Sequence, residues 1–144
     1  MEINMPDEQL NIFRTKTRIL YKHTDQMKVV YYGNYPEFYE IGRVELMRER
    51  GFPYAELEAM GIQMPIIEMH SKYIGSALYD ELIEIETSVK ERDKGVRIRF
   101  DYTIYNEAGK IQLIRKNGQL LKEEYVADGI YIEAYVPKEI YEKM

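Results

Sequence analysis

The chain has 144 residues, the usual length of one domain, and about two-thirds of the surface of such a chain can be buried on folding. It contains no cysteine, which excludes disulfides, thiolate metal sites and a cysteine nucleophile. The formal net charge of -5 argues against nucleic acid as a partner, because phosphate binding needs a positive field. We therefore expect a single domain over residues 1–144.

No apolar run approaches the ~20 residues that a membrane span requires, so no membrane partner is expected. The segment Met1–Leu10 mixes acidic and short apolar residues and lacks the basic-then-apolar order of a signal peptide. These features favour a soluble protein of the cytoplasm.

The first predicted element is a strand over Thr15–Tyr21, where apolar or β-branched residues alternate with basic ones. It leads into the polar stretch His23-Thr24-Asp25-Gln26. A change of hydrophobic period after this stretch marks the next element.

A long helix is predicted from about Asn34 to Arg50. One helical face carries the residues Tyr35, Phe38, Tyr39, Gly42 and Leu46. Asn34 is the expected N-cap, Glu37 three residues on fits a capping box, and Gly51 is the expected stop. Gly42 would permit close approach of another backbone.

A second, short helix over Pro53–Met60 is expected to end at Gly61, and the rest of the chain has the alternation of strands. The predicted strands are Met64–Tyr73, Ile83–Val89 and Val96–Ile104. Lys94-Gly95 and Asn106–Gly109 are expected hairpin turns. One long early helix followed by an antiparallel sheet indicates the α+β class.

The stretch from Thr24 to Tyr35 joins an acidic loop directly to a helix start. The first N–H groups of a helix lack internal partners and carry the positive end of the dipole, so they can receive an oxyanion. A carboxylate just upstream, Asp25, could attack a carbonyl held there or activate water against it. From the residues alone, the simpler alternative is that Asp25 caps a turn.

These residues also carry a resemblance to a known family, the acyl-CoA thioesterases of the 4-hydroxybenzoyl-CoA thioesterase type. The matching residues are Asp25-Gln26-Met27, Val30, Tyr32-Gly33-Asn34-Tyr35, Glu40–Arg43, Glu45, Met64-Pro65, Tyr73–Ala77, Tyr79–Leu82 and Phe100–Tyr105. The resemblance covers Thr15 to Lys110. It implies the hotdog fold, an antiparallel sheet wrapped around one long central helix.

The resemblance implies hydrolysis of an acyl-CoA thioester to free acid and CoA. Asp25 matches the catalytic aspartate, as nucleophile or as general base toward water, and Tyr32 matches the residue whose backbone N–H polarises the thioester carbonyl. Gly33, Asn34 and Tyr35 match substrate-binding positions. The resemblance implies no metal and no cofactor. It also implies subunits paired edge to edge with sites between them, and hence a homodimer or homotetramer.

Five further residues have both a functional and a structural interpretation. Lys94, Arg97 and Arg99 match positions where family members present basic groups to the CoA phosphates, although a solvated strand face is the simpler explanation. Glu45 is either a helix carboxylate used by another hotdog branch or a member of a structural ion pair, which we favour. His70 is expected to be a strand residue rather than a metal ligand.

Several positions depart from the family pattern. Lys28 replaces a usual glycine, and a lysine forced to positive φ would cost ~1–2 kcal/mol. His23 replaces a common acidic residue, and Tyr32 a common histidine. Residues Ile111–Ile132 do not follow the family's last strand, which is normally interior to the sheet. Either a turn at Asn117-Gly118 rearranges this end or the sequence is shifted in frame there.

Two other functions remain open. A non-catalytic hotdog protein that binds acyl-CoA or acts as a scaffold is suggested by Lys28 and by the unusual C-terminal third. A hotdog dehydratase or isomerase needs a histidine base near the helix, and neither His23 nor His70 matches that role well.

Overall fold

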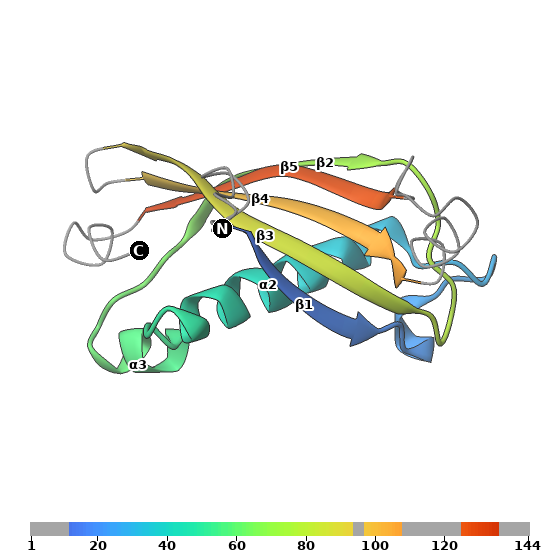
Figure 1. Cartoon of the computed structure of the whole chain (residues 1–144), viewed down its shortest axis with the longest axis horizontal. Helices are drawn as coiled ribbons and strands as arrows, with labels where there is room; N and C mark the ends of the chain where they lie inside the picture. Colours follow the sequence, from blue (N-terminus) through green and yellow to red (C-terminus); the bar gives the residue numbers. More distant parts are fainter. Residues whose placement is uncertain (1–11, 94–96, 108–124, 136–144) are drawn as a thin grey trace, which may run out of the picture.

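The computed structural model describes residues 12–93, 97–107 and 125–135, with the backbone alone at 90–93 and 125–135. In chain order the elements are β1 (Phe13–Arg18), the 3-10 turns η1 (Tyr21–His23) and η2 (Tyr32–Asn34), α2 (Tyr35–Glu49), α3 (Tyr54–Ala59), β2 (Ile66–Tyr73), β3 (Leu82–Asp93), β4 (Arg97–Asn106) and β5 (Tyr125–Tyr135). The long helix α2 lies against one face of the curved sheet (Figure 1). This is the predicted α+β arrangement.

The five strands form one antiparallel sheet in the order β1-β3-β4-β5-β2, with β1 and β2 at its edges. β5 lies between β4 and β2, so an interior last strand is present. It spans Tyr125–Tyr135, whereas residues 108–124 lie outside the described part of the chain. The predicted strands over 64–73, 83–89 and 96–104 correspond to β2, β3 and β4.

The predicted long helix is confirmed, but its start differs in detail. The turn η2 runs directly into α2, so helical backbone begins at Tyr32. The predicted capping box is wrong, because the side chains of Asn34 and Glu37 bind elsewhere. Asn34 Nδ2 donates to the carbonyl oxygen of His23 over 2.7 Å, and Glu37 contacts the imidazole of the same residue. Gly51, at φ +89°, follows the helix as expected.

The buried face of α2 consists of Tyr35, Phe38, Tyr39, Gly42, Leu46 and Met47. Gly42 is the point of closest approach to the sheet. A Cβ there would lie 2.9 Å from Ile85 Cγ2 and still closer to Thr87 Oγ1, both on β3. The close neighbours are therefore side chains of a strand rather than another backbone, and they fix the height of the helix above the sheet.

The first strand is shorter than predicted, because the chain turns after Arg18. Ile19 is fully buried, and Tyr21 begins η1 instead of continuing the strand. Within the described ranges, no helix has both the length and the hydropathy needed to cross a bilayer. The turn η1 brings the chain to the start of α2, where the candidate site lies.

Candidate active site

The loop that carries Asp25 is a short hairpin closed by backbone hydrogen bonds. Thr24 pairs with Val30, the Asp25 N–H donates to Val29 O over 2.9 Å, and the Lys28 N–H donates to Asp25 O over 2.9 Å. Lys28 has φ 65°, which is the left-handed conformation that such a three-residue loop requires at its last position. Lys28 thus takes a positive φ where the family usually has glycine, at a cost of ~1–2 kcal/mol.

The carboxylate of Asp25 is exposed and caps this turn. Its Oδ1 accepts the N–H of Met27 over 2.8 Å. No hydrogen bond to the other oxygen, Oδ2, is found among the described residues. The turn-capping alternative is therefore observed, and it leaves one carboxylate oxygen open while the other fixes the orientation of the group.

His23 links this loop to the helix through its carbonyl oxygen and its ring Nε2. Its carbonyl oxygen accepts the Tyr31 N–H over 3.0 Å and the amide of Asn34. Its ring Nδ1 accepts the Leu20 N–H over 2.9 Å, so the proton is on Nε2, which contacts Glu37 Oε2. The side chain is buried, and both ring nitrogens are engaged in structural contacts. His23 therefore does not supply the free histidine base that a dehydratase would need.

Glu37 is the charged partner that holds this arrangement to the helix. Burial by itself would raise the pKa of Glu37, but hydrogen bonds from Lys22 and His23 outweigh it and hold the pKa below its ordinary value. Lys22 Nζ lies 3.3 Å from Glu37 Oε1. Glu37 is thus an ionised anchor, near the positive end of the helix dipole.

The start of the helix presents two consecutive amides, those of Tyr32 and Gly33. Neither N–H donates to another backbone group in the described part of the chain. The carbonyl oxygen of Tyr32 accepts two hydrogen bonds, from the Tyr35 N–H and, over 3.3 Å, from the Tyr73 hydroxyl on β2. The peptide group between Tyr32 and Gly33 is therefore fixed, with its N–H available. The sequence gives no signal for Tyr73 in this role, because it lies on a distant strand.

Tyrosine rings lie next to this helix start. The ring centroids of Tyr31 and Tyr32 are 4.5 Å apart, and that of Tyr73 lies 6.1 Å from Tyr32. These three side chains are exposed. Tyr35, in contrast, is 2 % exposed, and its pKa is raised to about 12, chiefly by burial. Tyr35 thus belongs to the core, while the other three form an aromatic surface beside the amides.

The remaining predicted site residues lie apart from this region. Arg97 is the first residue of β4, and the hairpin that carries Asp25 lies near the other end of the sheet. The ten residues of β4 span roughly 30 Å. Within one chain, Arg97 and Asp25 are therefore not brought together, because the loop is bridged to Leu78, near the end of β4 that is opposite Arg97. Lys94 lies outside the described residues. Glu45 pairs with Arg48 over 3.6 Å, in agreement with the structural interpretation, and His70 is an exposed residue of β2.

Comparison with known proteins identifies the family of this chain. The model of the thioesterase superfamily matches residues 27–112, which is more than half of the chain. A relative from Bacillus subtilis named "Putative acyl-CoA thioesterase YneP" is 29% identical over 104 residues, covering 72% of this chain and 75% of its own.

Solved structures of named thioesterases are similar to this chain in fold. A DHNA-CoA thioesterase from Staphylococcus aureus has 27% identity and a TM-score of 0.73, covering 89% of this chain and 76% of its own. The 4-hydroxybenzoyl CoA thioesterase from Pseudomonas sp. strain CBS-3 has 19% identity and a TM-score of 0.70, covering 93% and 99%; at that identity it shows the fold alone. This chain therefore has the hotdog fold and belongs to the thioesterase superfamily.

Proposed function

We propose that the protein hydrolyses acyl-CoA thioesters to a free acid and CoA, with Asp25 as the catalytic carboxylate and the backbone N–H of Tyr32 as oxyanion donor. The observation that carries the proposal is an exposed, oriented carboxylate on the loop that leads into a helix start, whose first two amides have no backbone acceptor among the described residues. Relatives named as acyl-CoA and DHNA-CoA thioesterases support the substrate class.

The chemistry requires only a carboxylate and amide donors. Asp25 either attacks the thioester carbon or takes a proton from the water that attacks it. In both cases, negative charge develops on the carbonyl oxygen, and the N–H groups of Tyr32 and Gly33 stabilise it. The tetrahedral intermediate then expels the CoA thiolate. If water attacked, the free acid has formed; if Asp25 attacked, the acyl group remains on Asp25 as an anhydride, which water then hydrolyses to the free acid and the regenerated carboxylate. One oxyanion donor contributes ~2.7–4 kcal/mol, and a positioned acid or base contributes ~10²–10⁴-fold.

The proposal includes a homodimer or homotetramer. The edge strand β2 is exposed on both faces, and it carries the large apolar side chains Ile66, Ile67, Met69 and Tyr73. Such an edge invites pairing with another strand. Two copies joined through β2 would form one continuous sheet. Arg97, which is distant from Asp25 in its own chain, would contact a CoA bound at Asp25 only from a neighbouring subunit.

A hydrolysis screen tests the proposal against acyl-CoA binding without turnover. Short, long and aromatic CoA esters are incubated with the protein, and released CoA is read with a thiol reagent; the chain has no cysteine and adds no background. Turnover of at least one ester is expected. Calorimetric binding of esters without release of CoA would favour the binding or scaffold function instead. If the protein sediments as a monomer at micromolar concentration, the proposed homodimer or homotetramer is contradicted.

A further inference from the structure

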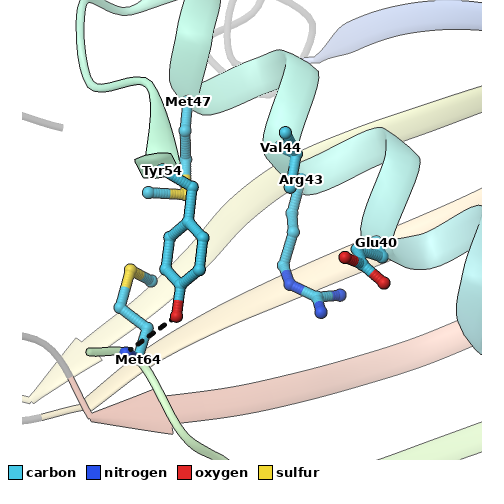
Figure 2. Close-up of a pocket in the computed structure, with 6 residues that line it drawn as sticks. All are labelled: Glu40, Arg43, Val44, Met47, Tyr54 and Met64. Atoms are coloured by element: carbon cyan, nitrogen blue, oxygen red, sulfur yellow. Dashed lines mark hydrogen bonds between the residues drawn. The ribbon is translucent and has the colours of Figure 1, made fainter. Parts of the chain in front are cut away.

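A cavity of about 210 Å³ lies beside the C-terminal half of α2. The residues that line it are Glu40, Arg43, Val44, Met47, Tyr54 and Met64. Figure 2 shows Met47 next to Tyr54 and Met64, with Arg43 and Glu40 farther along α2. By helical rise, Arg43 lies roughly 16 Å along the helix from Tyr32, so this cavity is separate from the proposed catalytic amides.

Arg43 is the cationic group that lines this cavity, and it forms no ion pair in the part of the chain that the structure describes. Its one hydrogen bond goes from Nη1 to the Tyr102 hydroxyl over 3.5 Å, at the limit for such a bond. No carboxylate in the described ranges lies within ion-pair distance of it. Because a half-buried guanidinium is costly to leave unpaired, an anion that enters the cavity would gain from it.

Tyr54 provides a second donor. Its hydroxyl oxygen accepts the Met64 N–H over 3.5 Å, so its own proton remains available. In Figure 2 this hydroxyl and the guanidinium of Arg43 extend in the same direction from their backbones. Beside them lie the thioether side chains of Met47 and Met64, which adapt readily to apolar groups of different shape. The cavity thus combines two hydrogen-bond donors with an apolar wall.

We propose that this cavity binds a small carboxylic acid in its ionised form. The carboxylate receives hydrogen bonds from Arg43 and Tyr54, and the apolar body of the ligand packs against Met47 and Met64. The volume is below the ~300–1,000 Å³ of sites for drug-sized ligands, so the site takes the acid alone and not a CoA ester. Binding is measured directly, and the proposal therefore stands whether or not hydrolysis is found.

Glu40 allows a second test of the proposal, because its carboxylate is the acidic group among the lining residues. In Figure 2 the guanidinium of Arg43 lies between the Glu40 carboxylate and the Tyr54 hydroxyl. A bound carboxylate on the Tyr54 side is repelled by Glu40, more weakly than it is attracted by Arg43. Removing the charge of Glu40 therefore strengthens binding, whereas removing the charge of Arg43 weakens it.

Titration with hexanoate tests the site, followed by NMR of ¹³C-labelled methionine methyl groups. Saturable shifts of the Met47 and Met64 methyls are expected, with the exposed Met27 unmoved. Hexanamide, which has nearly the same shape and no charge, should bind about tenfold more weakly or not at all. No saturable shift with hexanoate, or equal binding of the amide, would overturn the proposal.

Three variants complete the experiment. Arg43→Met should weaken hexanoate binding at least about tenfold, and Glu40→Gln should strengthen it about two- to fivefold. Arg48→Met, at an exposed arginine of the same helix, should leave it unchanged. If Arg43→Met fails to fold, the direction of the Glu40→Gln change still decides. Unchanged or weaker binding in that variant would contradict a carboxylate seated beside Arg43.

Discussion

The hydroxyl of Tyr73 donates a hydrogen bond to the carbonyl oxygen of Tyr32 over 3.3 Å, and thereby connects the edge strand β2 to the first helical turn. The same oxygen accepts the N–H of Tyr35. Hydrogen bonds in series polarise one another, so two donors on this oxygen make the N–H of the same peptide group, that of Gly33, a stronger donor. The edge strand thus contributes to the proposed oxyanion site without contacting substrate.

Tyr73→Phe tests this connection. Loss of one hydrogen bond is worth about 0.5–1.5 kcal/mol, so kcat on the best CoA ester should fall about 3- to 10-fold with little change in KM. The control is Tyr79→Phe, at an exposed tyrosine that makes an edge contact with Tyr21. A fall in kcat of the same size in both variants, or a change confined to KM, would contradict a positioning role for Tyr73.

Lys28→Gly should stabilise the protein. Glycine adopts the positive φ of this position freely, which recovers ~1–2 kcal/mol, while its greater freedom in the unfolded chain costs about 0.5–1 kcal/mol. A net gain of up to about 1.5 kcal/mol is expected in urea unfolding. Asp80, at φ 70°, is the matched site, and Asp80→Gly should gain less because aspartate tolerates this conformation. Destabilisation by Lys28→Gly would mean that the lysine side chain makes a compensating contact.

The pKa of Glu37 predicts a dependence of stability on pH. Because the folded pKa lies below the ordinary value of 4.5, the ionised group stabilises the fold above that value, and this contribution is lost as the pH falls toward the folded pKa. Glu37→Gln should therefore lower the urea midpoint at pH 7. The difference from wild type should shrink as the pH falls below 4.5.

Glu45→Gln is the control for this pH series, since Glu45 pairs only with Arg48 at the surface in the described part of the chain. Its midpoint should stay close to wild type at every pH, because exposed pairs contribute ~0–1 kcal/mol. A midpoint difference for Glu37→Gln that is the same at pH 7 and pH 4 would contradict the assignment.

Gly42→Ala should destabilise the fold through Thr87. Overpacking costs about 1–3 kcal/mol, which exceeds the ~1 kcal/mol that alanine gains in helix propensity. The added methyl group would meet Thr87 Oγ1 and Ile85 Cγ2 on β3. Thr87→Ala removes the nearer of these atoms, so the double variant should lose less stability than the sum of the single changes. Additive losses in urea unfolding would contradict this contact.

Local patterns in the sequence predicted the helices and the strands β1 to β4, but they did not predict β5. The helical spacing of Tyr35, Phe38 and Leu46 predicted the face of α2 that is buried, and period-two alternation predicted β3 and β4. The capping-box prediction was wrong at the helix start, although Asn34 and Glu37 have the spacing that a capping box requires. The buried His23 offers both side chains partners that no sequence spacing reveals.

The candidate site was predictable only where it follows the chain. Asp25 and the amide of Tyr32 lie within eight residues of each other, and a loop joined to a helix start connects them. Tyr73 reaches the same helical turn from β2, 41 residues after Tyr32, through sheet pairing that the sequence does not specify. Arg43 and Tyr54 likewise meet only because the chain folds back after α2.

The turnover number of Asp25→Asn on the best CoA ester is the most direct measurement. Asparagine keeps a side-chain oxygen for the Met27 N–H, so the turn and the fold should be preserved, which a thermal melt and the oligomeric state can verify. We expect kcat to fall by ~10²–10⁴-fold with the hairpin intact. A folded Asp25→Asn protein that turns over the ester at the wild-type rate would contradict the proposed mechanism.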